Sequence, residues 1–259
     1  SARKAIALNK RDGWAHHAVA HVMEMMGRYE EGAAFMRDHE SDWAPESFFQ
    51  VHNWWHLALF RLEADQNAEV LKLYDGPIRG GQSSMIMDML DASALLWRLK
   101  LRGVDLGNRW DAIADRWQPL IEDKLYAFND AHAVMALLGA GRLGEAERTV
   151  SILTETARKQ SDNALMSRDV GLPLARALVA FEHGKYAATI DLLRPLRNIA
   201  QRFGGSHAQR DLIDLTLIEA AKRAGEAGLV RALANERLAL KPKSPLARRY
   251  RDQTAKRAA

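Results

Sequence analysis

Residues 13–37 read GWAHHAVAHVMEMMGRYEEGAAFMR, and this stretch decides the fold. One apolar-periodic segment runs as far as Gly27, and a second one starts at Tyr29. Glycine takes up the left-handed conformation that ends helices without steric cost, so the stretch predicts two helices joined by a tight turn. Similar turn residues recur, first at intervals of 38 residues and then after gaps of 43 and 41, at Gly27, Asp65, Gly103, Gly141, Gly184 and Gly225.

The regular spacing predicts a repeat architecture, in which each hairpin buries its apolar face against the next. We therefore expect an all-α fold, a right-handed superhelix of about six helical hairpins that forms a single domain over residues 1–259. No alternating pattern typical of β-strands is found. The expected helices are Trp14–Met26, Tyr29–Arg37, Glu46–Ala64, Ala68–Tyr74, Met85–Arg102, Trp110–Ile121, Asn129–Ala140, Leu143–Gln160, Gly171–His183, Tyr186–Arg202, Ala208–Ala224, Leu229–Leu240 and Pro245–Ala258.

The formal charge of +4 is unevenly distributed. Residues 237–259 carry a local net charge of +7, and the rest of the chain carries −3. A block of like charge is usually a solvated surface, so we expect a basic C-terminal capping segment. A contact with phosphates or a membrane surface is the alternative. Tyr250 is the only aromatic residue there, which argues against a nucleic-acid partner.

The chain has no cysteine, which excludes disulfides and thiolate chemistry. This composition fits a reducing compartment, so we expect a cytoplasmic location. No uninterrupted apolar run approaches the roughly 18 residues of a membrane span.

Five of the nine histidines are predicted to face the same way. When each hairpin is numbered so that its turn residue is position 15, these histidines take positions 2, 5, 6 and 9 of their first helices. At about 100° per residue, these positions span an arc of roughly 100°. In stacked hairpins this arc lies on the inner, concave face. The five are His17, His21, His52, His56 and His132.

The first four of these histidines form two pairs, and the partners in each pair are four residues apart. This spacing lets two imidazoles of one helix reach the same ion. Glu24 follows on the same face, but Val19 and Ala20 stand where a zincin motif has its glutamate. A metal site and a ligand-free packing of histidine and tryptophan both remain open. The metal candidates are His17, His21, His52 and His56.

The predicted inner face is aromatic and rich in histidine, and it has few of the lysine, arginine and asparagine residues that grip a peptide backbone. We expect it to bind a protein segment, a peptide or a small, partly apolar ligand. The predicted binding residues are Trp14, His17, His21, His52, Trp55, His56, Ser93, Trp97, Phe128, Asp130, His132, His207 and Arg210.

Acid–base or metal chemistry in an enzyme is the alternative function. Asp91, Asp130 and Asp211 could orient an imidazole and tune it as a general base. Ser93 would be the hydroxyl nucleophile, although small residues at such positions more often allow helices to pack closely. Convergence of the five histidines within about 4–5 Å of one point would favour this chemistry. The sequence assigns no catalytic residue, cofactor or oligomeric state.

The residue strings themselves resemble a known family, the tetratricopeptide repeat protein 38 family. The resemblance covers essentially the whole chain and rests on Gly13–His21, His52–Leu59, Asp91–Leu99, Tyr126–Ala133 and Phe203–Asp211. It implies a tetratricopeptide-like superhelix and a longer N-terminal region than this chain contains, so the chain is expected to lack N-terminal repeats. It implies no particular biochemical activity.

Overall fold

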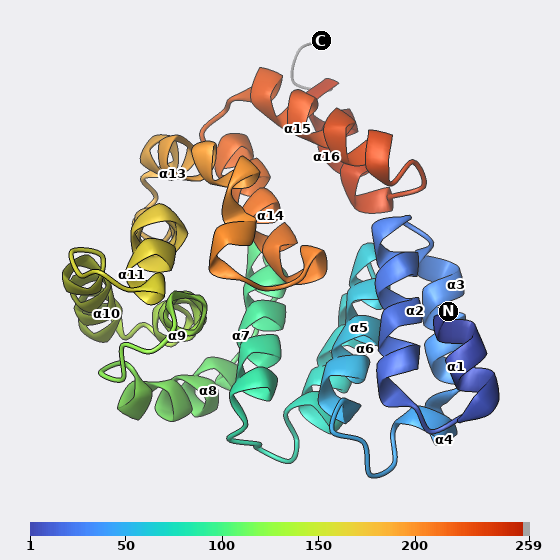
Figure 1. Cartoon of the computed structure of the whole chain (residues 1–259). Helices are drawn as coiled ribbons and strands as arrows, with labels where there is room; N and C mark the ends of the chain where they lie inside the picture. Colours follow the sequence, from blue (N-terminus) through green and yellow to red (C-terminus); the bar gives the residue numbers. More distant parts are fainter. Residues whose placement is uncertain (256–259) are drawn as a thin grey trace. The chain divides into compact units, whose positions relative to one another are not determined.

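The structure, a computed structural model, describes residues 1–255, and every regular element among them is a helix (Figure 1). The prediction of an all-α protein is therefore confirmed. None of the described helices combines the length and the apolar character that crossing a bilayer requires. Contacts within the chain define two compact units. The single-domain superhelix of six hairpins stays a prediction.

Unit 1 contains Ser1–Leu95 and the described part of Arg231–Ala259, so it is built from two separate stretches of the chain. In it, α2 packs against α3 and α5, and α5 packs against α6. Its elements are α1 (Ala2–Leu8), α2 (Gly13–Met25), α3 (Tyr29–Asp38), α4 (Glu40–Trp43), α5 (Gln50–Glu63), α6 (Asn67–Leu73), the wide turn η1 (Tyr74–Ile78), the first part of α7 (Ile86–Leu101), most of α15 (Ala227–Leu240) and α16 (Pro245–Ala255).

Unit 2 contains Leu96–Val230. In it, α9 packs against α8, α10 and α12, and α13 packs against α12 and α14. Its elements are the end of α7, α8 (Arg109–Trp117), η2 (Gln118–Leu120), α9 (Ala127–Gly139), α10 (Leu143–Thr156), α11 (Asp162–Met166), η3 (Ser167–Gly171), α12 (Leu172–Glu182), α13 (Tyr186–Leu193), η4 (Pro195–Asn198), η5 (Ala200–Phe203), α14 (His207–Arg223) and the start of α15.

All six predicted turn residues have positive φ angles, between 63° and 81°, and each lies two residues past the last residue of a helix. Two backbone hydrogen bonds close each turn. At Gly27 the amide donates to the Glu24 carbonyl at 3.0 Å, and the next amide, of Arg28, donates to the Met23 carbonyl at 2.8 Å. This is the Schellman arrangement, and the same pair of bonds recurs at the other five turns. The turn residues in the sequence were therefore sufficient to predict the positions of these six turns.

Several predicted helix bounds were wrong. The helix expected over Glu46–Ala64 begins only at Gln50, because Glu46 has a φ of 53°. The helices expected over Trp110–Ile121 and Tyr186–Arg202 end at Trp117 and Leu193, shortly before Pro119 and Pro195. Proline lacks an amide hydrogen and collides with the preceding turn, so each of these two helices is followed by a short 3₁₀ turn.

The basic C-terminal segment packs on the rest of unit 1. The Lys241 ammonium pairs with Glu24, and the Arg249 guanidinium pairs with Asp65 at the second predicted turn. The last four residues of the predicted capping segment, 256–259, lie outside the described residues. Part of the basic charge is thus neutralised by acidic groups of the same unit.

Candidate functional site

Two facing helices of unit 1, α2 and α5, carry the candidate site. The carboxylate of Asp12 caps α2 by accepting a hydrogen bond from the Ala15 amide at 3.0 Å. The side-chain amide of the buried residue Asn53 donates to the Gly13 carbonyl at 3.2 Å and ties the start of α5 to the start of α2. A Cβ at Gly32 of α3 would come within 2.4 Å of the Phe60 ring, so glycine allows α3 to approach α5 closely. These contacts hold α2, α3 and α5 together.

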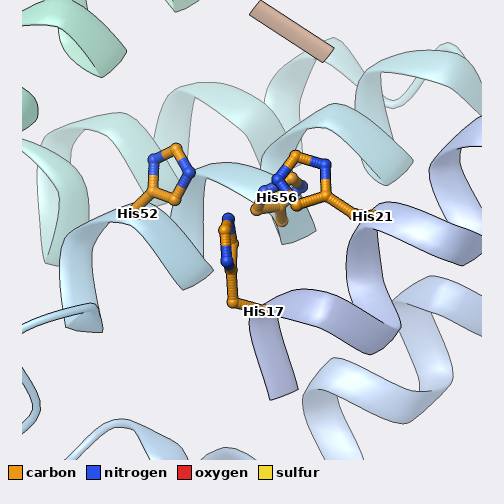
Figure 2. A group of neighbouring side chains, drawn as sticks. All are labelled: His17, His21, His52 and His56. Carbon is orange, nitrogen blue, oxygen red and sulfur yellow. The ribbon is translucent and has the colours of Figure 1, made fainter. Parts of the chain in front are cut away.

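Four histidines converge between these two helices (Figure 2). One donor nitrogen of each lies within 4.8 Å of a donor nitrogen of every other. The ring centroids of His17 and His21 on α2 are 4.3 Å apart, and those of His21 and His56 are 4.5 Å apart. Zinc–imidazole bonds of about 2.1 Å place neighbouring nitrogens of a tetrahedral site roughly 3.4 Å apart. Small side-chain rotations would therefore bring all four nitrogens onto one ion.

His52 is oriented by two neighbours. Its Nδ1 lies 2.7 Å from the Oδ2 of Asp91 on α7, and both side chains are buried. Its ring stacks on Trp55, with centroids 5.2 Å apart and planes 14° from parallel. Because a nitrogen that faces a carboxylate donates to it, Nε2 of His52 is left as the metal-binding atom. The expected pairing of Asp91 with an imidazole is therefore present, and its role in tuning a general base stays a prediction.

His56 is fully buried, and neither of its ring nitrogens has a hydrogen-bond partner within residues 1–255. Nε2 of His17 is buried and has no hydrogen-bond partner in that range either. A buried polar atom without a partner costs about 1–3 kcal/mol, and such atoms are rare in folded proteins. A bound ion would satisfy these nitrogens.

Burial keeps these imidazoles neutral. Desolvation, followed by the nearby His52 and His21, lowers the pKa of His17 to about 3. Desolvation also lowers the pKa of His56 well below its usual value, with further lowering from the other three histidines. Metal ions bind the neutral form of imidazole, so protons do not compete for these nitrogens near pH 7.

The donor set and its exposure indicate which chemistry is possible. Imidazole nitrogens suit zinc, copper, nickel, cobalt or iron, whereas calcium and magnesium prefer oxygen ligands. His17 and His21 are partly exposed, whereas His52 and His56 are buried, so solvent reaches the cluster from the side of α2. On that side Trp14 is 63% exposed, and its ring centroid lies 6.1 Å from that of His17. Glu24 pairs with Lys241 instead of joining the four histidines.

Other predicted site residues serve the packing of their units. Ser93 is fully buried and its hydroxyl donates to the Met89 carbonyl at 2.7 Å, the contact of a small helix-packing residue. Trp97 is fully buried and its Nε1 donates to the Thr216 hydroxyl at 3.1 Å. Trp55 is fully buried as well. Their expected role in ligand binding stays a prediction.

The remaining predicted residues belong to unit 2. His132 is buried, its Nδ1 donates to the Phe128 carbonyl at 2.7 Å, and desolvation lowers its pKa to about 4. Phe128 packs on Phe203 and Tyr126. Arg210 donates to the carbonyls of Gly204 and Gly205, and His207 is exposed. His132 is thus not part of the group of four.

Asp130 is an unusual carboxyl of unit 2. It is 6% exposed. Desolvation, with a smaller contribution from Asp123, raises the pKa of Asp130 to about 7. Among the described residues no metal-ligating group includes Asp130, so its predicted role as a binding residue or as the partner of an imidazole stays a prediction.

A second group, formed by His16, His39 and Asp42, was not predicted from the sequence. His16 lies outside the predicted arc, and the other two follow the end of α3. The only signal in the sequence was the spacing of three residues between His39 and Asp42 at a helix end.

No family model matches the chain, and no solved structure matches it significantly. Membership of the tetratricopeptide repeat protein 38 family therefore stays a prediction that rests on the residue strings.

Proposed function

We propose that unit 1 is a metal-dependent binding module that holds a divalent first-row transition metal ion through His17, His21, His52 and His56. Zinc is the first candidate because four neutral imidazoles match its tetrahedral preference. The observation that carries the proposal is His56, a fully buried imidazole with two unpartnered nitrogens that faces three other histidines. Hydrogen-bonded packing alone would have given these nitrogens partners.

The charges around the cluster support the same function. Four neutral imidazoles leave the positive charge of the ion uncompensated, and burial of an unpaired charge is costly. Asp91 supplies one negative charge through His52, an arrangement that fixes the tautomer and raises the basicity of a ligating imidazole.

The half-exposed side of the cluster gives the ion a position for an outside ligand. Zinc can expand to five-coordination, so a donor atom of a small molecule could bind between His17 and His21. The exposed Trp14 ring would contact the apolar part of that molecule. The proposed ligand is therefore a small, partly apolar molecule with one metal-binding group. A cytoplasmic location, expected from the cysteine-free composition, belongs to the same proposal.

A second candidate is hydrolysis, and the same open side of the cluster favours it. Zinc lowers the pKa of a bound water toward neutral and so creates a hydroxide nucleophile. Both candidate functions require a metal ion at the four histidines, and the zinc-binding experiment below tests that requirement.

The test is zinc affinity, measured on tag-free, metal-stripped protein by competition with a chromophoric chelator. The variant His17→Ala/His21→Ala removes two partly exposed ligands and should weaken binding at the four-histidine centre by more than about 100-fold. The variant Asp91→Asn keeps all four ligands and should weaken it by about 10–100-fold. His183→Ala changes an exposed histidine of unit 2 and should have no effect.

Circular dichroism of each variant checks that helix content is kept. Cobalt substitution adds a spectroscopic readout, since a tetrahedral four-nitrogen site gives intense visible absorption. Wild-type protein that takes up no zinc, or folded ligand variants that bind as tightly as wild type, would overturn the proposal.

A further inference from the structure

A second group of metal-ligating side chains lies in unit 1, outside the four-histidine centre. One donor atom each of His16, His39 and Asp42 lies within 4.8 Å of the other two. They come from three different segments: helix α2, the junction between α3 and α4, and α4. His39 and Asp42 are three residues apart, and the tertiary fold brings His16 of α2 next to them.

The tautomer of His16 leaves a free lone pair in this group. Its Nδ1 lies 2.9 Å from the Asp12 carbonyl, and a ring nitrogen that faces a carbonyl oxygen must donate to it. Nε2 therefore carries the lone pair. His16 is fully buried, and its Nε2 has no hydrogen-bond partner within residues 1–255. Ligating imidazoles in proteins are usually fixed in this way by a hydrogen bond to the second nitrogen.

The other two donors are held by a rigid turn. Nδ1 of His39 lies 3.2 Å from Oδ2 of Asp42. The next residue, Trp43, is fully buried, donates from Nε1 to the Met36 carbonyl at 2.9 Å, and contacts the Trp54 ring at a centroid distance of 4.8 Å. This anchor fixes α4 against the body of unit 1 and places the Asp42 carboxylate beside the histidines.

The surroundings differ from those of the first centre. The side chains of His39 and Asp42 are 37% and 27% exposed, so solvent reaches this group. The Phe35 ring packs against both imidazoles, with centroids 5.7 Å from His16 and 4.7 Å from His39. The group therefore combines one buried nitrogen, from His16, with two donor side chains that solvent reaches.

We propose that His16, His39 and Asp42 form a second, independent site for a divalent transition metal ion. Two imidazoles and one carboxylate suit zinc, iron(II), cobalt or nickel and leave coordination positions for water. The carboxylate supplies a negative charge directly to the ion, which the all-histidine centre lacks. Since residues 16 and 17 are neighbours on α2, the helix contributes to both sites from adjacent positions.

The test counts ions. Tag-free, metal-stripped protein is titrated with Zn²⁺ by isothermal calorimetry, and metal content is then measured after gel filtration. Wild type should bind two ions per chain. His39→Ala and Asp42→Asn change partly exposed side chains and should each bind one. His17→Ala/His21→Ala should also bind one, and its combination with His39→Ala should bind none.

The cobalt spectrum separates the two sites. Loss of the second site should leave the intense four-nitrogen bands intact, whereas loss of the first should leave only the weaker bands of a site with oxygen ligands and higher coordination. His183→Ala is the control and should bind two ions. If His39→Ala and Asp42→Asn both fold and bind as many ions as wild type, the second site does not exist, whatever the result for the four-histidine centre.

Discussion

Burial shifts the pKa values of histidine and aspartate side chains of this protein in opposite directions. Burial lowers the pKa of His17 and His132, because it disfavours the charged imidazolium. The same desolvation raises the pKa of Asp130, because there the charged form is the deprotonated one. All three groups are therefore biased toward neutrality.

Asp130 leads to a prediction about stability and pH. Its pKa is about 7 in the folded protein and 3.8 for an unperturbed aspartate, so the folded state binds more protons between these limits. Stability should fall as the pH rises from 4 to 7, by at most ~4 kcal/mol for this one group. Asp130→Asn should abolish that loss and be more stable than wild type above pH 7, but not at pH 4.

Urea denaturation at several pH values measures the difference. Asp111→Asn, at an exposed aspartate of unit 2, serves as the control. An equal effect of Asp130→Asn at pH 4 and pH 8 would contradict the assignment.

The sequence could predict that His17, His21, His52 and His56 share one helix face, because the spacing of four residues is a local property, but it left their convergence open and also placed His132 on that face. The sequence could not predict the second group. His16 lies on another face of α2, and its neighbours His39 and Asp42 are placed by the fully buried Trp43. Such a contact depends on tertiary packing that the local pattern does not encode.

At the scale of elements, the turns were predictable and the helix lengths were not. A left-handed turn requires glycine or a short polar residue, so Gly27 and Asp65 were recognisable from the sequence alone. Helix α4, by contrast, lies between the two expected helices Tyr29–Arg37 and Glu46–Ala64, where no helix was predicted, and its four residues are stabilised by the anchor at Trp43. Tertiary contacts decided the short elements.

Two of the turn glycines make a matched pair for experiment. Gly27 and Gly141 have φ angles of 65° and 72°. A Cβ at Gly27 would lie 3.0 Å from the Cα of Lys241, whereas a Cβ at Gly141 would meet nothing within 4 Å. Gly141→Ala should cost about 1–2 kcal/mol of unfolding free energy, the penalty of a left-handed alanine.

Gly27→Ala should cost more than Gly141→Ala, because the crowded backbone at Lys241 must also move. Chemical denaturation of the two single variants gives the comparison. Equal losses would show that the Lys241 segment yields without strain.

The whole molecule should lose stability in acid. In metal-free protein, His17 and His132 have folded pKa values of about 3 and about 4, below the 6.5 of an unperturbed histidine. The unfolded state then binds more protons within this window, so their contribution to stability is complete above pH 6.5 and is lost as the pH falls. The fully buried His132 alone should account for roughly 3 kcal/mol.

Asp130 opposes this trend over part of the same range, so the measurement is best made on Asp130→Asn. Its unfolding free energy should fall between pH 6.5 and pH 4. Adding His132→Gln to that variant should make the decrease in unfolding free energy smaller, whereas adding His183→Gln, at an exposed histidine, should not. A pH-independent unfolding free energy would contradict the assigned burial of these histidines.

The sequence carried no sign of the division into two units. Repeats of near-constant length predict one continuous stack, and nothing in composition marks the changes at Leu95 and Arg231. The division depends on which helices contact each other, and that is a property of the folded chain.

Unit 1 consists of two stretches that are separated in the chain, so its two parts are synthesised at different times. Residues 96–230 emerge from the ribosome before the segment from Arg231 onward, so unit 2 is complete in the nascent chain while unit 1 still lacks α16. Glu24 and Asp65 cannot form their ion pairs with Lys241 and Arg249 until those two residues have been translated. The four histidines of the cluster are therefore translated early, whereas the ion pairs of Glu24 and Asp65 with the C-terminal segment can form only once that segment has been made.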